Sequence, residues 1–283
     1  MNLIMTLLVR NEEDVLAENI EYHLSQGVDF IIATNNRSTD STEEILKNYE
    51  SKGVLHYLSQ DGDTHSQGRW VTEMARLAAK EFAADWIINN DADEFWWPTN
   101  HSSLKQALSA ISGEYNIVEA TRKNFAFLNT DSGNSFYQEM IYRDKESFNA
   151  LGRPLPPKQA HVSCDNIIVA EGNHSVQGIV QPHINKDIIE IFHFPIRSPV
   201  QFTRKILNGG AALARNTELA NNIGSTWRSL YKQLLESGDL NNYLDSQAFD
   251  TEKLQNQLEM GKIVEDRRLK NYLDETNYLI KKL

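Results

Sequence analysis

The stretch that decides the fold runs from Trp86 to Pro98 and reads WIINNDADEFWWP. It opens with an apolar run typical of a buried strand, turns acidic at Asp91, Asp93 and Glu94, and returns to aromatic residues. Carboxylates at the end of a buried strand are costly to desolvate unless a positive charge lies among them. A divalent cation bound by Asp91 and Asp93 would supply that charge, because side chains two residues apart in an extended segment point to one side. Oxygen ligands alone suit a hard ion, so the stretch predicts a site for Mg²⁺ or Mn²⁺.

Three apolar runs precede this stretch, and each is followed by a helical pattern. The runs cover residues 3–9, 28–34 and 54–58, and the apolar start of the quoted stretch supplies a fourth strand at 86–90. Strands that alternate with helices are typical of an α/β protein with a doubly wound, mostly parallel sheet flanked by helices. Ligands of such sheets gather beyond the carboxyl ends of the strands.

Unusual polar clusters stand directly after three of the four predicted strands. They read RNEE at 10–13, NNRSTD at 35–40 and DADE at 91–94. The carboxyl ends of parallel strands lie at the same edge of a sheet, so this fold would bring the three clusters together. Scattered surface polarity would not be sorted in this way. The coincidence therefore predicts a binding site at that edge.

The composition limits the kinds of partner that the protein can have. The chain has 283 residues and a formal net charge of −11. This charge argues against nucleic acid as a partner, because binding to a phosphate backbone normally needs a basic surface. The single cysteine, Cys164, can form no disulfide within the chain. No segment approaches the ~18 apolar residues of a membrane helix and the N-terminus lacks a signal-peptide pattern, so we expect no membrane span and a cytoplasmic protein.

The same motifs resemble those of the family 2 glycosyltransferases and their close relatives of the GT-A fold. Those enzymes carry N-E-E after the first strand, D-D/N-x-S-x-D-x-T after the second and D-x-D after the fourth. The corresponding stretches here are VRNEEDVLAENIEYHLSQGVDF, NNRSTDST and INNDADEFWWP. The resemblance covers about residues 1–98 well. It continues more weakly to about residue 207, through GNH at 172–174 and HFPIRSPVQFTRKI at 193–206.

The resemblance implies the GT-A form of the α/β fold and an enzyme that transfers a sugar from a nucleotide-diphosphate donor to an acceptor hydroxyl, with inversion. The partners would be a UDP-, GDP- or dTDP-sugar and a saccharide or glycoconjugate acceptor, in polysaccharide or glycoconjugate synthesis. We expect a GT-A domain at residues 1–205, divided into a nucleotide-sugar-binding half at 1–98 and an acceptor half at 99–205. The helical pattern after about residue 201 predicts a helical C-terminal extension at 206–283.

The resemblance also implies roles on the donor side. Asp91 and Asp93 would hold Mn²⁺ or Mg²⁺ against the diphosphate, and His193, at the end of an apolar stretch, would be a third ligand. Asn35 stands where the family usually has an aspartate that contacts the base or ribose. Its uncharged amide puts the usual uridine preference in question. The residues expected to bind the donor are Arg10, Asn11, Glu12, Asn35, Arg37, Arg69 and Asp91.

The acceptor side needs a base that removes the hydroxyl proton as C1 of the sugar is attacked. The family uses a downstream carboxylate, for which Asp165, Glu171 and Asp187 are candidates, with Asp165 and Glu171 preferred. Aromatic rings can stack on sugar rings, although the alternative is that they fill core beneath the loop. The residues expected at the acceptor are Glu94, Trp96, Trp97 and His174.

Two other interpretations of the D-x-D pattern stay open. One is a metal-dependent phosphatase or nucleotidyltransferase. Phosphatases of this type carry the pattern on the first strand, and sugar nucleotidyltransferases open with a glycine-rich loop, whereas this chain has D-x-D after the fourth strand and RNEE after the first. The other is a non-catalytic nucleotide- or sugar-binding protein on the same fold, which the amide at Asn35 keeps open. A measurement of nucleotide-sugar turnover would distinguish such a binding protein from an enzyme.

Overall fold

The computed structural model describes the whole chain except residues 65, 112, 129–133, 150–151, 221–222 and 281–283. The described chain forms two compact units, each assembled from separate segments. The first unit contains residues 1–122, 156–192 and 215–218, and the second contains residues 123–155, 193–214 and 219–283. The expected boundary between residues 205 and 206 falls inside a helix that spans Pro199–Arg215.

Four parallel strands form the part of the sheet that the sequence predicted. They are β1 (Leu3–Val9), β2 (Phe30–Asn35), β3 (Leu55–Ser59) and β4 (Trp86–Asn90). They lie in the order β3-β2-β1-β4, and the register aligns Val9 with Asn35 and Leu7 with Asn90. The carboxyl ends of β1, β2 and β4 therefore share one edge. This confirms the predicted α/β class with a mostly parallel sheet flanked by helices.

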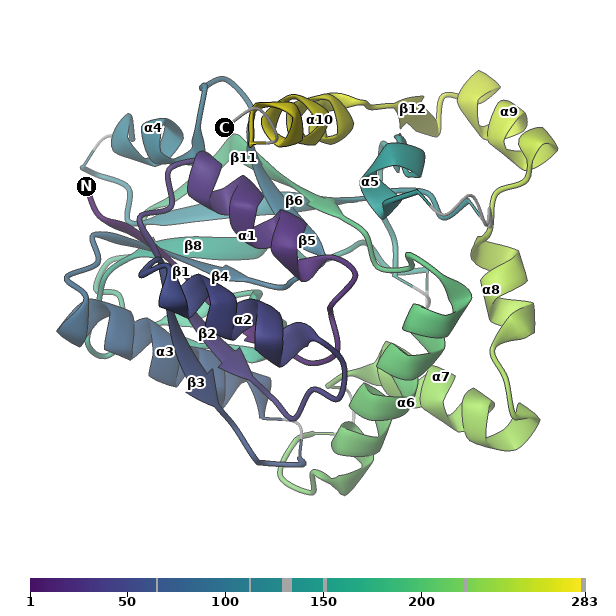
Figure 1. The fold of residues 1–283 in the computed structure, drawn as a ribbon, viewed down its shortest axis with the longest axis horizontal. Coiled ribbons are helices and arrows are strands. Elements are labelled where there is room, and N and C mark those ends of the chain that lie inside the picture. Colours follow the sequence, from purple (N-terminus) through teal and green to yellow (C-terminus); the bar gives the residue numbers. More distant parts are fainter. Residues whose placement is uncertain (65, 112, 129–133, 150–151, 221–222, 281–283) are drawn as a thin grey trace. The chain divides into compact units, whose positions relative to one another are not determined.

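The helices α1 (Leu16–Ser25), α2 (Thr42–Ser51) and α3 (Gln67–Glu81) connect these strands (Figure 1). The apolar side of α3 packs against the sheet, because its apolar residues recur at helical spacing. One core cluster joins residues of α3 to the sheet residues Ile4, Ile32 and Ile87; the α3 members are Val71, Met74, Ala75 and Ala78. Burial of a large apolar side chain stabilises the fold by roughly 1.5–3 kcal/mol. This packing fixes α3 against β1 and β4.

Four further strands complete an eight-stranded sheet. They are β5 (Glu94–Pro98), β6 (Ile117–Asn124), β8 (Lys158–Val162) and β11 (Ile184–His193), and the full order is β3-β2-β1-β4-β8-β6-β11-β5. β8 runs antiparallel to β4, pairing Ile88 with Ala160 and Trp86 with Val162. The start of β8 therefore lies near the carboxyl end of β4, and the residues that follow β8 lie near its amino end.

Short elements complete the first unit. They are α4 (Leu104–Ser109), β9 (Ile168–Val169), the 3-10 helix η1 (Glu171–Asn173) and β10 (Val176–Gln177). β9 and β10 pair antiparallel as a small separate sheet. Both β9 and η1 pack against α3. This contact brings the segment around residue 170 to the first turn of α3.

The second unit is mostly helical. Its elements are α5 (Phe136–Glu139), β7 (Tyr142–Asp144), α6 (Pro199–Arg215), α7 (Ser225–Ser237), α8 (Asn241–Gln247), α9 (Thr251–Glu259), β12 (Ile263–Glu265) and α10 (Arg268–Ile280). A core cluster joins Phe202 and Ile206 of α6 to Leu230 and Leu234 of α7. The strands β7 and β12 pair antiparallel.

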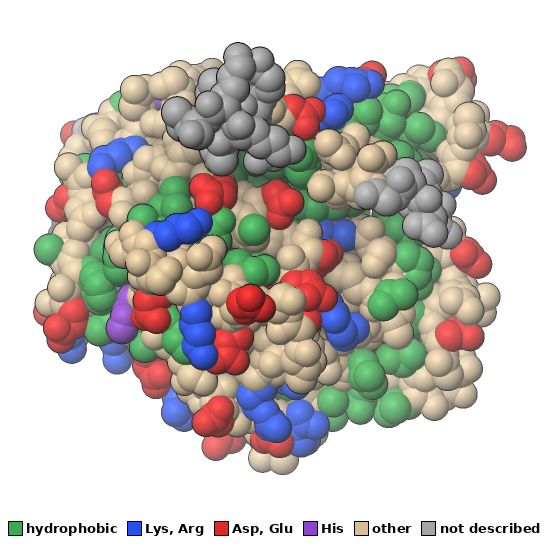
Figure 2. Space-filling model, viewed as in Figure 1, with side chains coloured by type: hydrophobic (Ala, Val, Ile, Leu, Met, Phe, Trp, Pro, Cys, Tyr) green, Lys and Arg blue, Asp and Glu red, His purple; other side chains and the backbone are tan. Residues whose placement is uncertain are grey.

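Charged side chains of both signs are interspersed over the face seen in Figure 2. The carboxylates outnumber the basic groups, as the formal net charge of −11 requires. Among the described residues, no helix combines the length and the apolarity that crossing a membrane would need.

Candidate functional site

The acidic cluster lies in the turn between β4 and β5. Asp91 directly follows β4, and its backbone oxygen accepts a hydrogen bond from Glu94 N at 3.0 Å. The Asp91 side chain is 27% exposed, whereas Asp93 is buried and Glu94 has no exposed surface. Asp91 is therefore the most accessible carboxylate of the turn.

Buried amides hold this turn in place. Asn19 of α1 donates from Nδ2 to Ala92 O at 2.9 Å and to Glu94 O at 2.8 Å. Its Oδ1 accepts from Asn90 Nδ2 at 3.0 Å, and Asn90 Oδ1 accepts from Trp96 Nε1 at 3.0 Å. Buried polar groups are costly unless they are paired, so these mutual bonds specify one arrangement of the turn. Asn19 was not predicted from the sequence; the available signal was the polar pair Asn89-Asn90 at the end of an apolar strand.

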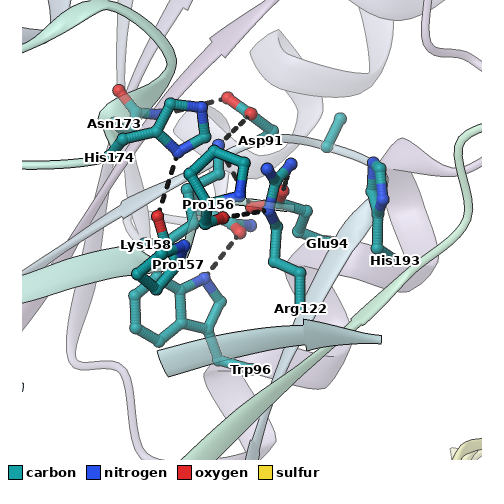
Figure 3. Close-up of polar contacts among 12 residues, drawn as sticks. Asp91, Glu94, Trp96, Arg122, Pro156, Pro157, Lys158, Asn173, His174 and His193 are labelled. Atoms are coloured by element: carbon teal, nitrogen blue, oxygen red, sulfur yellow. Dashed lines mark hydrogen bonds and ion pairs between the residues drawn. The ribbon is translucent and has the colours of Figure 1, made fainter. Parts of the chain in front are cut away.

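Lys158 lies among the carboxylates (Figure 3). Its Nζ is 2.5 Å from Asp91 Oδ2 and 3.4 Å from Glu94 Oε2, and only 1% of the side chain is exposed. Because β8 is antiparallel to β4, its first residue reaches the carboxyl end of β4. The positive charge that the buried carboxylates require is thus part of the chain itself.

Arg122 of β6 supplies a second positive charge. Its Nη1 is 3.4 Å from Glu94 Oε1, and its Nε donates to Pro156 O at 2.9 Å. Burial raises the pKa of Glu94 to about 7, with Asp91 and Asp93 adding to the rise, while Lys158 and Arg122 oppose it. Glu94 is consequently held by two cations beneath the surface and does not face solvent.

Two side-chain amides donate hydrogen bonds to the other carboxylate oxygen of Asp91, Oδ1. Gln67 at the start of α3 donates from Nε2 to Asp91 Oδ1 at 3.1 Å, and Asn173 of η1 donates from Nδ2 at 3.0 Å. Glu171 Oε1 accepts from Gly68 N at 3.0 Å, which places a carboxylate at the amino end of α3, where the helix dipole favours negative charge. Glu171, predicted as a base, therefore anchors α3 to η1 beside Asp91.

His174 stands next to this group (Figure 3). Its Nδ1 is 3.0 Å from Pro157 O, and a carbonyl can only accept, so Nδ1 carries the proton and Nε2 keeps its lone pair. Burial, with repulsion from Lys158 and Arg122, lowers the pKa of His174 to about 4. A Cβ on Gly172, whose φ is +73°, would lie 2.6 Å from His174 Nε2, so this position needs glycine. His174 is a neutral imidazole held in one tautomer.

The clusters after β1 and β2 interlock at the same edge. Asn11 Oδ1 accepts from Thr39 N at 2.7 Å, and Asn11 N donates to Ser38 Oγ at 3.0 Å. Asn35 Oδ1 accepts from Ser38 N at 3.2 Å. The prediction that RNEE and NNRSTD lie side by side is confirmed. The Oδ1 atoms of Asn11 and Asn35 thus both accept from backbone N–H groups.

A positive field surrounds Arg10, which follows β1 directly. Burial lowers the pKa of Arg10, and repulsion from Arg37 and Arg215 adds to this effect, while Asp63 opposes it. Arg215 also donates from Nη2 to Asp63 O at 2.8 Å. The guanidinium groups of Arg37 and Arg215 are thus close enough to repel that of Arg10, which lies at the end of β1. Glu12 is buried there, and its N donates to Thr42 Oγ1 at 2.9 Å.

A family model described as glycosyltransferase family 92 matches residues 5–182. The chain belongs to glycosyltransferase family 92. The match includes the three strand-end clusters, Lys158, Asn173 and His174. The predicted glycosyltransferase class is confirmed, and the family shown is family 92; membership of family 2 itself is not confirmed.

Several solved structures share remote similarity with this family 92 chain. TarS residues 1–349 of S. aureus in complex with UDP-GlcNAc is 13% identical, with a TM-score of 0.46 over 90% of this chain and 78% of that one. Glucosyl-3-phosphoglycerate synthase of Mycobacterium tuberculosis, in complex with Mn²⁺, UDP and glucosyl-3-phosphoglycerate, is 18% identical, with a TM-score of 0.32 over 43% of this chain and 44% of that one. The chain spans 45% of a longer TarS structure. No curated protein matches it in sequence.

The structure of this family 92 protein corrects several expected acceptor contacts. Glu94 and Trp96 have no exposed surface, so neither can touch an acceptor. Trp97 stacks between Tyr22, at a centroid distance of 6.1 Å, and Phe192, at 5.2 Å. Phe95 and Trp96 therefore fill core, which was the alternative interpretation, whereas Trp97 keeps intermediate exposure. Helix α1 packs on β5, and burial of these rings beneath it stabilises the fold because it removes apolar surface from water.

Two other predicted residues lie away from Asp91. Arg69 is 72% exposed, and its Nε is 3.2 Å from Glu73 Oε1 on the next turn of α3. Asp165 is exposed and follows Val162, which pairs with Trp86 at the amino end of β4, so it lies at the opposite edge of the sheet. Linear spacing could not reveal that β8 runs antiparallel to β4. Asp187 lies in β11, and its side chain is outside the described part of the chain.

The expected divalent cation does not fit the groups around Asp91. Both oxygens of Asp91 already accept hydrogen bonds from nitrogen donors, and a cation there would lie against the ammonium of Lys158. His193 belongs to the second unit, where its Nδ1 is 2.7 Å from Asn124 Oδ1. Within the described residues, no group of three or more His, Cys, Asp or Glu side chains could hold a metal ion. The side chains around Asp91 therefore do not fit the Mg²⁺ or Mn²⁺ ion that the sequence predicted there.

Proposed function

We propose that this protein transfers a sugar from a nucleotide-diphosphate donor to a hydroxyl of a saccharide or glycoconjugate acceptor, in polysaccharide or glycoconjugate synthesis. Membership of family 92 supports the class of reaction. The donor would be a UDP-, GDP- or dTDP-sugar bound at the edge where β1, β2 and β4 end.

The positive field around Arg10 carries this proposal. Arg37 and Arg215 both repel Arg10, which favours an anion bound beside Arg10. The overall charge of the chain is −11, so this positive field is local and opposite in sign to the whole molecule. A diphosphate offers both the negative charge and the oxygen acceptors that guanidinium groups bind best. The diphosphate would therefore lie near Arg10, with the sugar toward Asp91.

On the acceptor side, we assign the role of base to His174 in place of Asp165 and Glu171. Its Nε2 lone pair is fixed by the bond from Nδ1 to Pro157 O, and the neutral form persists down to about pH 4 because burial lowers its pKa. The acceptor oxygen would attack C1 as the C1–oxygen bond to the diphosphate breaks, and the hydroxyl proton would pass to Nε2. A single displacement of this kind inverts the configuration at C1.

No divalent cation at Asp91 takes part in the proposed reaction, because Asp91 already accepts hydrogen bonds from Lys158, Gln67 and Asn173. Charge on the departing diphosphate would instead be stabilised by the guanidinium groups near Arg10, which are charged at all working pH values.

The test is binding and hydrolysis of nucleotide sugars. Calorimetric titration of UDP, GDP and dTDP into the full chain should show one of them binding, and Arg10→Gln should weaken that binding by about 10-fold or more, because one hydrogen-bonded charge is worth roughly 1.5–3 kcal/mol. The matched control is Arg267→Gln, which removes an exposed arginine paired with Glu265 in the second unit.

Hydrolysis then separates the enzyme from a binding protein. A transferase should slowly release the nucleotide diphosphate from the sugar donor of the preferred base, and His174→Gln should lower sugar transfer without changing nucleotide affinity. Equal nucleotide binding by the Arg10 and Arg267 variants would refute the donor site proposed here. Binding without any turnover would favour the non-catalytic alternative.

A further inference from the structure

Lys158 occupies the position at which the sequence predicted a metal ion. Its Nζ lies 2.5 Å from Asp91 Oδ2 and 3.4 Å from Glu94 Oε2, so it bridges two carboxylates of the same turn. A lysine that is 1% exposed is stable as an ammonium only if carboxylates or carbonyls surround it. Asp91 and Glu94 meet that need, and each in turn depends on Lys158.

The other carboxylate oxygen of Asp91 also accepts hydrogen bonds from side chains of the protein. Oδ1 accepts from Gln67 Nε2 at 3.1 Å and from Asn173 Nδ2 at 3.0 Å. These donors come from α3 and η1, so Asp91 joins three separate elements: β4, α3 and η1. A divalent cation on Asp91 would have to break these bonds and leave the buried ammonium of Lys158 with Glu94 as its remaining carboxylate. Breaking one side of a buried ion pair is strongly destabilising.

Glu94 also has a second positive partner within the protein, Arg122. Arg122 Nη1 is 3.4 Å from Glu94 Oε1, and Arg122 is itself fixed by its bond from Nε to Pro156 O at 2.9 Å. The cluster of Asp91 and Glu94 is thus matched by Lys158 and Arg122, one positive group for each of these two carboxylates. A further cation is not required to hold this pair of acids in the protein.

We propose that Lys158 is the resident cation of this site and that Asp91 is a positioning residue tied to it, with no divalent cation bound through Asp91. This inference depends only on the side chains around Asp91 and does not rest on the proposed sugar transfer.

The experiment measures Mn²⁺ binding to the full chain by electron paramagnetic resonance, without nucleotide. Asp91→Asn should leave the affinity for Mn²⁺ within about 2-fold of the wild-type value, including the case in which neither protein binds Mn²⁺ measurably. Lys158→Met removes the ammonium and frees Asp91 Oδ2, so its affinity for Mn²⁺ should rise at least 10-fold. Lys80→Met, a change at an exposed lysine of α3, is the matched control and should leave the affinity unchanged.

Two results would overturn the proposal. One is a loss of 10-fold or more in Mn²⁺ affinity with Asp91→Asn, which would make Asp91 a ligand despite Lys158. The other is an unchanged affinity in a folded Lys158→Met protein. Circular dichroism establishes folding, and Lys158→Gln replaces Lys158→Met if the latter is unfolded. If neither lysine variant folds, the Asp91→Asn result decides alone. No sugar donor is present in this experiment. A result against the proposed role of Lys158 would therefore not count against the proposed sugar transfer, and a negative result for sugar transfer would not count against the role of Lys158.

Discussion

Two buried histidines in the first unit make the stability of the protein depend on pH. Burial lowers the pKa of His23 and of His161 to about 4. In the unfolded chain a histidine titrates near its ordinary value of about 6.5. Between these values the unfolded state binds more protons than the folded state, so the free energy of unfolding falls as the pH falls from about 6.5 to 4. Each histidine contributes ~3 kcal/mol to that loss.

The replacement His161→Phe tests this pH dependence at one residue. No described residue forms a hydrogen bond with His161 Nε2, so the ring can be replaced with a smaller loss than at His23, whose Nε2 accepts from Trp96 N. We expect the decline in the free energy of unfolding between pH 6.5 and 4 to become shallower by ~3 kcal/mol. Urea denaturation at several pH values measures this dependence of the free energy of unfolding on pH. His101→Phe, at an exposed position, is the control, and an unchanged slope in His161→Phe would contradict the prediction.

The first turn of α3 is the element on which the arrangement around Asp91 depends. Gln67 binds Asp91, and Gly68 N donates to Glu171 at the next position. A Cβ at Gly68 would lie 3.0 Å from Val169 O and 3.2 Å from Glu171 N. The close approach of α3 to β9 and η1 therefore favours glycine at residue 68, because a Cβ there would crowd both elements.

The replacement Gly68→Ala should push these elements apart. Crowding of a packed contact costs typically ~1–3 kcal/mol, and the better helix propensity of alanine offsets up to ~1 kcal/mol of this. We expect a net loss of ~1–2 kcal/mol in the free energy of unfolding and weaker nucleotide binding. Urea denaturation and calorimetry provide the measurements. Gly113→Ala, at an exposed glycine with nothing within 4 Å of its Cβ position, should change neither quantity. Equal effects of the two replacements would argue against a tight contact at α3.

At the scale of the whole molecule, the chain passes several times between two units that have separate cores. In the second unit, α6 and α7 approach closely at a pair of glycines. A Cβ at Gly209 would lie 1.7 Å from Cζ3 of Trp227, and one at Gly210 would lie 2.3 Å from Cβ of Tyr231. These glycines let the aromatic residues of α7 lie against the backbone of α6.

The replacement Gly209→Ala tests whether the two units differ in local stability. Displacing the Trp227 ring should destabilise the second unit by ~1–3 kcal/mol. Hydrogen exchange followed by mass spectrometry should show faster exchange in α6 and α7, while β1 and β4 of the first unit keep their protection. Uniform acceleration across both units would show instead that the chain opens as a single cooperative body.

Much of the first unit could be predicted from sequence alone. Apolar runs of strand length, alternating with helical patterns, predicted four parallel strands, and the strand-end clusters at 10–13, 35–40 and 91–94 predicted the common edge. The aromatic stretch after Glu94 was harder to interpret. A strand and a ligand-facing loop look alike when all residues are apolar, and burial beneath α1 is a property of packing.

The amino-acid sequence by itself determined the α/β class, the edge at which β1, β2 and β4 end and the need for positive charge among Asp91, Asp93 and Glu94. These features follow from local patterns, because strand periodicity and local charge depend only on residues that are adjacent in the sequence. Only the tertiary structure decided what supplies that charge. Lys158 lies 67 residues beyond Asp91 in the chain and reaches it because β8 inserts antiparallel beside β4. Such pairing is set by packing of the whole sheet, which no local pattern encodes.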